Sequence, residues 1–172
     1  MFTKADAEAY FLAEKQMCLL ILIVGIIAIV AGIILIAFIK TPMYKGMGIA
    51  ILAIGILQSV VGYTVYARSD AQRKDIVYKM DLNPGAITGE EIPRMEKVMK
   101  NFTIYRIAEV ILLIVAIVLI VMHRNNPPKQ WLYGVSIGIA IQVAILLIGD
   151  SIAAKRGASY LNGLQTWISA MK

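Results

Sequence analysis

The chain has 172 residues, of which 59% are hydrophobic, and its mean hydropathy is +0.75. A soluble domain is closer to half apolar, and here the excess is gathered in long uninterrupted runs, so we expect a single integral membrane domain. The net charge of +6 suits contact with the anionic headgroups of a lipid bilayer. Because the basic residues are scattered along the chain, nucleic acid is not an expected partner.

The sequence contains one cysteine, Cys18, and one histidine, His123. A single cysteine allows no disulfide within the chain, and the usual zinc sites need several Cys or His ligands. No nucleophile beside a base and no glycine-rich phosphate loop can be recognised. We therefore expect no metal, no cofactor and no enzymatic activity.

Four apolar segments are each long enough to cross a bilayer, because about 20 helical residues suffice. They comprise residues 16–39, 46–67, 102–122 and 131–153. Proline interrupts a helix, so the KTPMYK and NNPP sequences separate the first segment from the second and the third from the fourth. This pattern predicts an all-α fold, a four-transmembrane-helix bundle.

The polar segments at the two ends of the chain also have helical patterns. Residues 1–15 are expected to be helical from Thr3, which would act as the N-cap with Asp6 in the first turn. Residues 154–172 carry apolar side chains at helical spacing, which predicts a short amphipathic helix lying on the membrane surface or on a protruding hairpin formed by residues 68–101. Gly157 and Gly163 would weaken this C-terminal helix.

Residues 68–101 are polar but keep helical spacing, so spans two and three are predicted to extend into a protruding helical hairpin. Thr88 and Glu91 have the spacing of a capping box, which would start its second arm. Methionines on its inner face predict a hairpin core or, alternatively, an adaptable surface for a partner. These methionines are Met80, Met95 and Met99.

Small residues recur on one face of the second span and one face of the fourth, a pattern typical of closely packed membrane helices. Such faces could serve packing within the chain or a homo-oligomer equally well. Gln58 and Gln142 are placed near the middle of the bilayer, and we expect them to share one interhelical hydrogen bond.

Several ionisable and tyrosine side chains fall at one end of the spans, where charges need partners. These candidates for a network or a ligand site are Arg68, Asp70, Arg106, Glu109, Asp150, Tyr66 and Tyr105. We expect an ion pair between Arg106 and Asp150, with Arg68 or a tyrosine hydroxyl group serving Glu109. Two interpretations stay open, a neutral network that holds the helices in register and a pocket that binds an ion, a headgroup or a partner's side chain.

Four spans put both termini on the same side of the membrane. That side carries 13 of the Lys and Arg residues, and the two short loops carry 4. The positive-inside rule then predicts a multi-pass protein of the plasma (inner) membrane with both termini and the hairpin in the cytoplasm.

Two functions fit these observations. The first is a non-catalytic membrane protein that acts through protein–protein interaction, using the hairpin, as a subunit of an envelope or secretion complex or as a membrane immunity or inhibitor protein. The alternative is a small transporter or channel with a charged polar site on its cytoplasmic side.

Overall fold

The computed structural model describes residues 2–171, so Met1 and Lys172 of the predicted terminal segments lie outside the described residues. Its four long helices are α1 (Lys4–Ala37), α2 (Pro42–Leu82), α4 (Ile92–His123) and α5 (Gln130–Ser169). Three short turns, α3 (Pro84–Ala86), η1 (Ile87–Glu91) and η2 (Pro127–Lys129), complete the connections. All four long helices are long and apolar enough to cross a membrane, as predicted.

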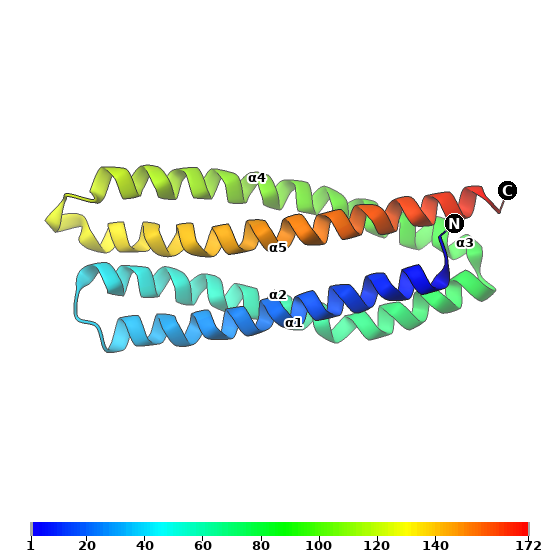
Figure 1. Cartoon of the computed structure of the whole chain (residues 1–172), viewed down its shortest axis with the longest axis horizontal. Coiled ribbons are helices and arrows are strands. Elements are labelled where there is room, and N and C mark those ends of the chain that lie inside the picture. The colour runs from blue at the N-terminus through cyan, green and yellow to red at the C-terminus, as the bar shows by residue number, and fades with distance from the viewer. Residues whose placement is uncertain (1, 172) are drawn as a thin grey trace.

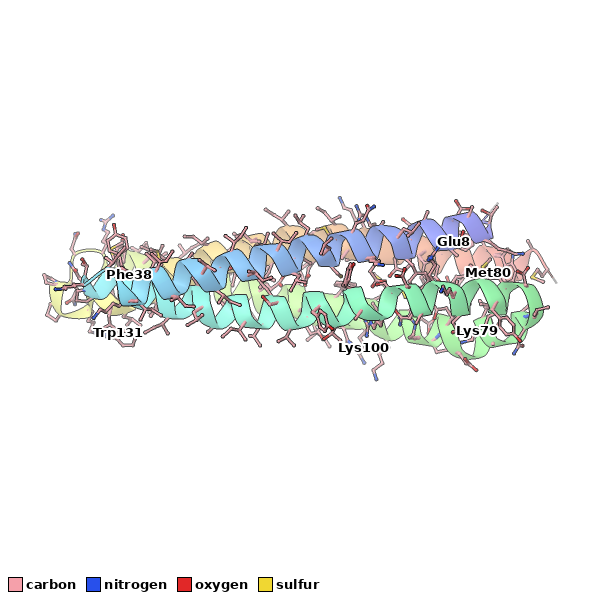
Figure 2. All side chains as sticks on the ribbon, turned by 90° about the horizontal axis from the view of Figure 1, so that it is seen from below. Glu8, Phe38, Lys79, Met80, Lys100 and Trp131 are labelled. Carbon is pink, nitrogen blue, oxygen red and sulfur yellow. The ribbon has the colours of Figure 1, made fainter. Side chains whose placement is uncertain are left out.

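The long helices form two antiparallel hairpins that lie side by side, α1 with α2 and α4 with α5 (Figure 1). Both termini lie at the same end, and α2 packs against α5 to join the hairpins. The result is a long narrow rod with Phe38 near one end and Glu8 near the other (Figure 2). We call residues 16–39, 46–67, 102–122 and 131–153 the apolar half, and residues 2–15, 68–101 and 154–171 the water-side half.

The first helix begins as the sequence predicts. Thr3 is the N-cap, and its side chain accepts a hydrogen bond from the backbone N–H of Asp6 at 3.3 Å. The Asp6 carboxylate in turn accepts from the backbone N–H of Thr3 at 2.8 Å. This reciprocal capping box satisfies two N–H groups that lack a partner within the helix.

The small residues of the apolar half bring helix backbones into direct contact within the chain. A methyl group added to Gly134 would lie 1.8 Å from the Met43 carbonyl oxygen, and one added to Gly46 would lie 2.0 Å from that of Trp131. Between α1 and α2, Gly32 and Gly48 approach each other in the same way. These stripes are therefore used for packing inside the chain.

The predicted capping box at Thr88 and Glu91 is wrong. Residues Ile87–Glu91 form a π-helical turn, and α4 begins at Ile92 with no side-chain cap. The carboxylate of Glu91 is only 6% exposed and accepts two hydrogen bonds from Arg94, each 2.7 Å long. The charged hydrogen bonds from Arg94 are stronger than the hydrogen bond to a backbone N–H that a capping box would supply. Glu91 therefore bonds to Arg94 and not to the backbone near Thr88.

The prediction that the C-terminal segment forms a separate helix is wrong, because α5 continues unbroken to Ser169. Of its two predicted positions, the one against the hairpin is found, since Tyr160 and Leu164 share a core with Met80 and Met95. The two glycines of the C-terminal segment serve close packing: a methyl group on Gly163 would lie 2.2 Å from the ring of Phe2, and one on Gly157 would lie 3.0 Å from the sulfur of Met99. The predicted hairpin is therefore not a solitary arm. It is one part of a bundle to which the N-terminal turns of α1 and the end of α5 also contribute.

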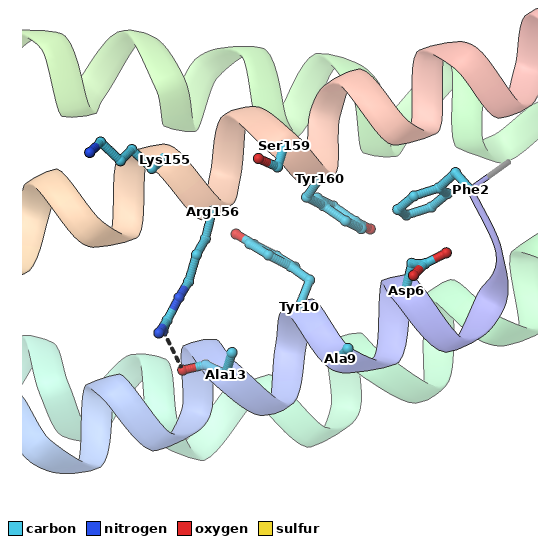
Figure 3. A pocket seen from close by; sticks show the side chains of 9 residues that line it. All are labelled: Phe2, Asp6, Ala9, Tyr10, Ala13, Lys155, Arg156, Ser159 and Tyr160. Atoms are coloured by element: carbon cyan, nitrogen blue, oxygen red, sulfur yellow. Dashed lines mark hydrogen bonds between the residues drawn. The ribbon is translucent and has the colours of Figure 1, made fainter.

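An aromatic stack joins the two ends of the chain in the water-side half. The rings of Tyr10 and Tyr160 are parallel to within 6°, with centroids 4.1 Å apart (Figure 3). Phe2 and Phe11 contact Tyr160 edge-on at 6.0 and 5.6 Å. Both geometries are favoured by the charge distribution of aromatic rings, so the stack holds α1 against α5.

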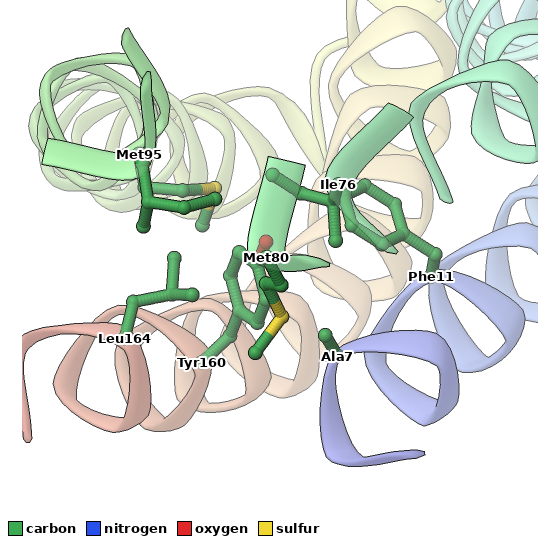
Figure 4. Packing of buried hydrophobic residues seen from close by; sticks show 8 residues of the cluster. Ala7, Phe11, Ile76, Met80, Met95, Tyr160 and Leu164 are labelled. Atoms are coloured by element: carbon green, nitrogen blue, oxygen red, sulfur yellow. The ribbon is translucent and has the colours of Figure 1, made fainter. Parts of the chain in front are cut away.

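Around this stack lies a core to which all four long helices contribute (Figure 4). It consists of Ala7, Phe11, Ile76, Met80, Ile87, Met95, Tyr160 and Leu164. Met80 is 4% exposed and Met95 is fully buried, so the interpretation of these two as a partner surface is wrong and the core interpretation is confirmed. Met99 is partly buried and packs against Gly157.

Ion pairs connect α1 and α2 along the water-side half. Lys4 pairs with Asp81, Lys15 with Asp70, and Glu8 with Arg73 at 3.5 Å. Exposed pairs of this kind contribute about 0–1 kcal/mol each. The signs of the charges alternate along each helix, so a shift of α1 against α2 would bring like charges together. The pairs therefore matter more for the register of the two helices than for the stability of the fold.

Candidate functional site

The most buried ionic group of the water-side half is Glu91. Its carboxylate accepts the hydroxyl hydrogen of Tyr160 at 2.9 Å in addition to the two hydrogen bonds from Arg94. Burial disfavours the charged form of Arg94, but these hydrogen bonds outweigh burial and hold its pKa above the ordinary value. Burial and the neighbouring carboxylate raise the pKa of Tyr160. The cluster is thus a neutral unit that links α4 to α5.

Glu14 lies on α1 one turn closer to the apolar half than Tyr10, and its carboxyl group interacts electrostatically with Arg94 and Glu91. Burial raises the pKa of Glu14, and the positive charges of Arg94 and Arg68 offset this only in part. Burial, followed by the negative charge of Glu14, also raises the pKa of Tyr10. At the end of the water-side half next to the apolar half, Glu14 therefore binds its proton more tightly than it would in an unfolded chain.

We expect Glu14→Gln to stabilise the protein at neutral pH and to flatten its pH dependence. The folded pKa of Glu14 is raised, so its contribution to stability is complete below the ordinary pKa of 4.5 and is lost as the pH rises through the folded value. Glutamine mimics the protonated acid and removes that loss. The measurement is thermal unfolding of the full chain in neutral detergent at a series of pH values from about 4 to 8, a range chosen to span this linkage. Identical profiles for the variant and the parent would contradict the assignment.

A second pair of acids lies in the apolar half. Glu109, on α4, is 8% exposed, and its Oε2 atom has no hydrogen-bond partner among residues 2–171. Its carboxyl group interacts with that of Asp150 on α5. Two ionised carboxylates that face each other away from water repel, so this pair is suited to share a proton or to hold a cation.

The predicted ion pair between Arg106 and Asp150 is not among the ion pairs of the described residues. Arg106 is exposed and lines a shallow groove together with Lys155. A long arginine side chain at the edge of an apolar segment can extend its charge towards water, so Arg106 forms no ion pair with Asp150, although its positive charge still acts on both carboxyl groups of the pair. Neither Arg68 nor a tyrosine hydroxyl group serves the buried oxygen of Glu109.

The other predicted site residues do not converge on this acid pair. Asp70 pairs with Lys15 and lies 3.9 Å from Arg73. The ring of Tyr66 receives the ammonium group of the same lysine, 4.9 Å from its centroid. The structure leaves Arg68 exposed and Tyr105 52% exposed. The site residues predicted at one end of the spans therefore belong to two separate groups. One is a surface cluster on α1 and α2, and the other is the acid pair between α4 and α5.

Gln58 and Gln142 are each 3% exposed, but the hydrogen bond predicted between them is not formed, and both side-chain carbonyl oxygens lack a partner. The reason is the packing register. Gly134 meets Met43 and Gly138 meets Met47, so α2 and α5 run parallel with Gln58 about seven residues beyond the level of Gln142. At the rise of an α-helix this separates the two amides by about 10 Å along the bundle.

Sequence reasoning missed the cluster of Glu91, Arg94, Tyr10 and Tyr160. The only local signal is the spacing of Glu91 and Arg94, three residues apart on one helix face. Tyr10 and Tyr160 are 150 positions apart in the sequence, so their stacking depends on the antiparallel packing of α5 beside α1. No sequence pattern predicts that contact.

Comparison with known proteins gives no relative: the chain matches no family model, no curated protein and no solved structure. Within residues 2–171, no group of three or more His, Cys, Asp or Glu side chains is arranged to hold a metal ion.

Proposed function

We propose that this protein is a non-catalytic integral protein of the plasma membrane that binds a protein partner through the far end of its water-side half. In this proposal the two termini and the water-side half lie in the cytoplasm, in keeping with the positive-inside rule. The partner would be a subunit of an envelope or secretion complex, or a toxin that the protein neutralises.

The exposure of large apolar side chains supports the membrane location. Ile27 is 61% exposed, Leu57 is 65% exposed and Ile148 is 64% exposed, and each comes from a different helix of the apolar half. Soluble proteins rarely expose contiguous apolar surface on this scale. Lipid chains would cover these side chains at no cost, whereas water would not.

The observation that carries the interaction surface is a pair of exposed apolar side chains at the far end of α2. Tyr78 is 61% exposed and Leu82 is 70% exposed, and their spacing of four residues puts them on one helix face. The charged side chains Lys79, Asp75 and Glu90 lie close by and pair with one another at 2.7 and 2.9 Å. An apolar pair beside a fixed set of charges is typical of a surface that binds protein.

Site-specific photo-crosslinking tests this surface. A photoreactive amino acid at Leu82 of the full chain, expressed in the source cells, is expected to form one discrete protein adduct. Tyr78→Ser should reduce this adduct without changing the amount of folded protein, because the Tyr78 side chain is mostly exposed and surface substitutions have small effects on stability.

The control position is Glu96, which is exposed on α4 and does not belong to the surface formed by Tyr78 and Leu82. An adduct of equal yield from Glu96, or no adduct from Leu82, would remove the proposal. Point substitutions are preferable to replacing residues 81–90 as a block, since Ile87 is fully buried in the core. A block replacement would unfold the bundle, and partner binding would then be lost through unfolding and not through loss of the binding surface.

A second candidate function, a small transporter or channel, is favoured by the acid pair in the apolar half. Glu109 and Asp150 could pass a proton or a small cation, since ionisable groups inside membranes often mark such pathways. Flux of protons or monovalent cations into proteoliposomes would be expected, with a large loss in Glu109→Gln and in Asp150→Asn. A parent protein that shows no flux above empty vesicles would exclude this function.

A further inference from the structure

A groove between α1 and α5 runs along the water-side half, and its end at Ala13 and Lys155 lies next to the apolar half. It has a volume of about 470 Å³, and Figure 3 shows its walls, formed by the first turns of α1 and by α5 beyond its apolar segment. The stacked rings of Tyr10 and Tyr160 lie between these walls. Such a groove would open at the level of the lipid headgroups if the apolar half spans the bilayer.

The chemistry of the groove changes along its length. Lys155 and Arg156, both exposed, line the end that faces the apolar half, and Ser159 lies one turn further along α5. The other end is lined by Phe2 and by Asp6, whose carboxylate is occupied by the capping box. Positive charge is therefore concentrated at the membrane-facing end.

One contact holds the arginine in place. Arg156 donates one N–H of its guanidinium group to the backbone carbonyl of Ala13 at 3.2 Å (Figure 3). This hydrogen bond crosses from α5 to α1 and orients the group at the mouth of the groove. A guanidinium group has five N–H donors, so donors remain for an anion.

Further positive charge surrounds this end of the groove. Arg106 and Lys155 line a second, smaller groove of about 230 Å³ on the α4 side of α5. These cations attract anions to the boundary, while the groove between α1 and α5 supplies the oriented donors.

We infer that the groove between α1 and α5 binds a phosphate group, and specifically the phosphate of an anionic membrane lipid, through Lys155, Arg156 and Ser159. Arginine and lysine are the usual partners of phosphate oxygens, and the serine hydroxyl group supplies a further hydrogen bond. The aromatic rings beside them offer apolar surface to the rest of the headgroup. The site is separate from the Tyr78 and Leu82 surface, and only the lipid source of the phosphate depends on the proposed membrane location.

The test uses the purified full chain in a neutral detergent with three probes. Dioctanoyl-phosphatidylglycerol presents the phosphate on a lipid with a net negative charge, dioctanoyl-phosphatidylcholine presents it with a compensating amine, and inorganic phosphate presents it without a lipid. Native mass spectrometry counts bound lipid, and the rise in unfolding temperature with probe concentration provides the affinity. We expect saturable binding of one phosphatidylglycerol molecule that is tighter than binding of phosphatidylcholine.

Charge variants locate the site. Lys155→Gln with Arg156→Gln should weaken phosphatidylglycerol binding by about tenfold or more, the equivalent of at least one charge-assisted hydrogen bond. Lys97→Gln with Lys100→Gln removes the same charge from the exposed face of α4 and should leave the affinity within about twofold, since it leaves the donors of the groove unchanged.

A second pair of variants covers the case in which loss of the Arg156 hydrogen bond impairs folding. Ser159→Glu adds a negative charge inside the groove, and Gln165→Glu adds the same charge at an exposed position of α5 outside it. Only the first should abolish binding. Equal losses in the groove variants and their controls, or no saturable binding of any probe, would overturn the proposal.

The probes also distinguish the source of the phosphate. Inorganic phosphate that competes with phosphatidylglycerol at similar concentrations would retain the phosphate site but reject the lipid as its ligand. Weak competition by inorganic phosphate supports the lipid. Failure of crosslinking at Leu82 would have no bearing on either result, so this inference and the proposed partner surface can fail independently.

Discussion

Replacing Gly134 by alanine is expected to destabilise the contact between α2 and α5 more than any other single methyl addition to this chain. The added carbon would lie 1.8 Å from the Met43 carbonyl oxygen, which belongs to rigid backbone and cannot rotate away as a flexible side chain can. Overpacked sites typically cost about 1–3 kcal/mol, and we expect the upper end of that range. Thermal unfolding of the full chain in neutral detergent provides the measurement.

Gly89→Ala is the matched control, because a methyl group there would meet nothing within 4 Å. Alanine also favours a helical backbone over glycine, so this variant should be neutral or slightly stabilised. Gly46 approaches α5 through the same contact, with a methyl group 2.0 Å from the Trp131 carbonyl oxygen. The double variant at Gly46 and Gly134 should therefore cost less than the sum of the single variants. Equal unfolding temperatures for Gly134→Ala and Gly89→Ala would show that α2 and α5 do not approach so closely.

The second large effect is expected at Glu91. Glu91→Leu leaves the Arg94 guanidinium and the Tyr160 hydroxyl group without the acceptor they share. Breaking a buried ion pair from one side costs about 3–5 kcal/mol, and we expect the lower end because the Arg94 side chain is 33% exposed. Unfolding followed by circular dichroism in detergent, with the exposed Glu96→Gln as the control, measures this loss.

A double variant separates the loss of the pair from a loss of packing. Glu91→Leu combined with Arg94→Leu removes both charges, and replacing a buried pair by apolar side chains is often neutral. The double variant should therefore be more stable than Glu91→Leu alone. If the two variants were equally unstable, the ionic contact would not be the source of the effect.

Much of the fold could be predicted from local patterns. The four long apolar runs, the interruption at NNPP and the N-cap at Thr3 all depend on residues within a few positions of one another, and the structure confirms each. The candidate site could be predicted only in part. Glu109 is one of the predicted site residues and is buried, but its spacing could not show that it would face Asp150, another acid, while Arg106 is exposed.

What the sequence determined by itself is the kind of molecule: four helices long and apolar enough to cross a membrane, with a polar extension of the second and third. Helical periodicity and hydropathy are carried by neighbouring residues, so these features can be read without a partner segment. Only the tertiary structure decided that α5 runs unbroken beside α1, that Glu91 turns inward to Arg94 and Tyr160, and that a groove forms between the two ends of the chain. Apart from the pair of Glu91 and Arg94, these contacts join residues far apart in sequence, so local preferences such as those of glycine and of a capping box do not reveal them.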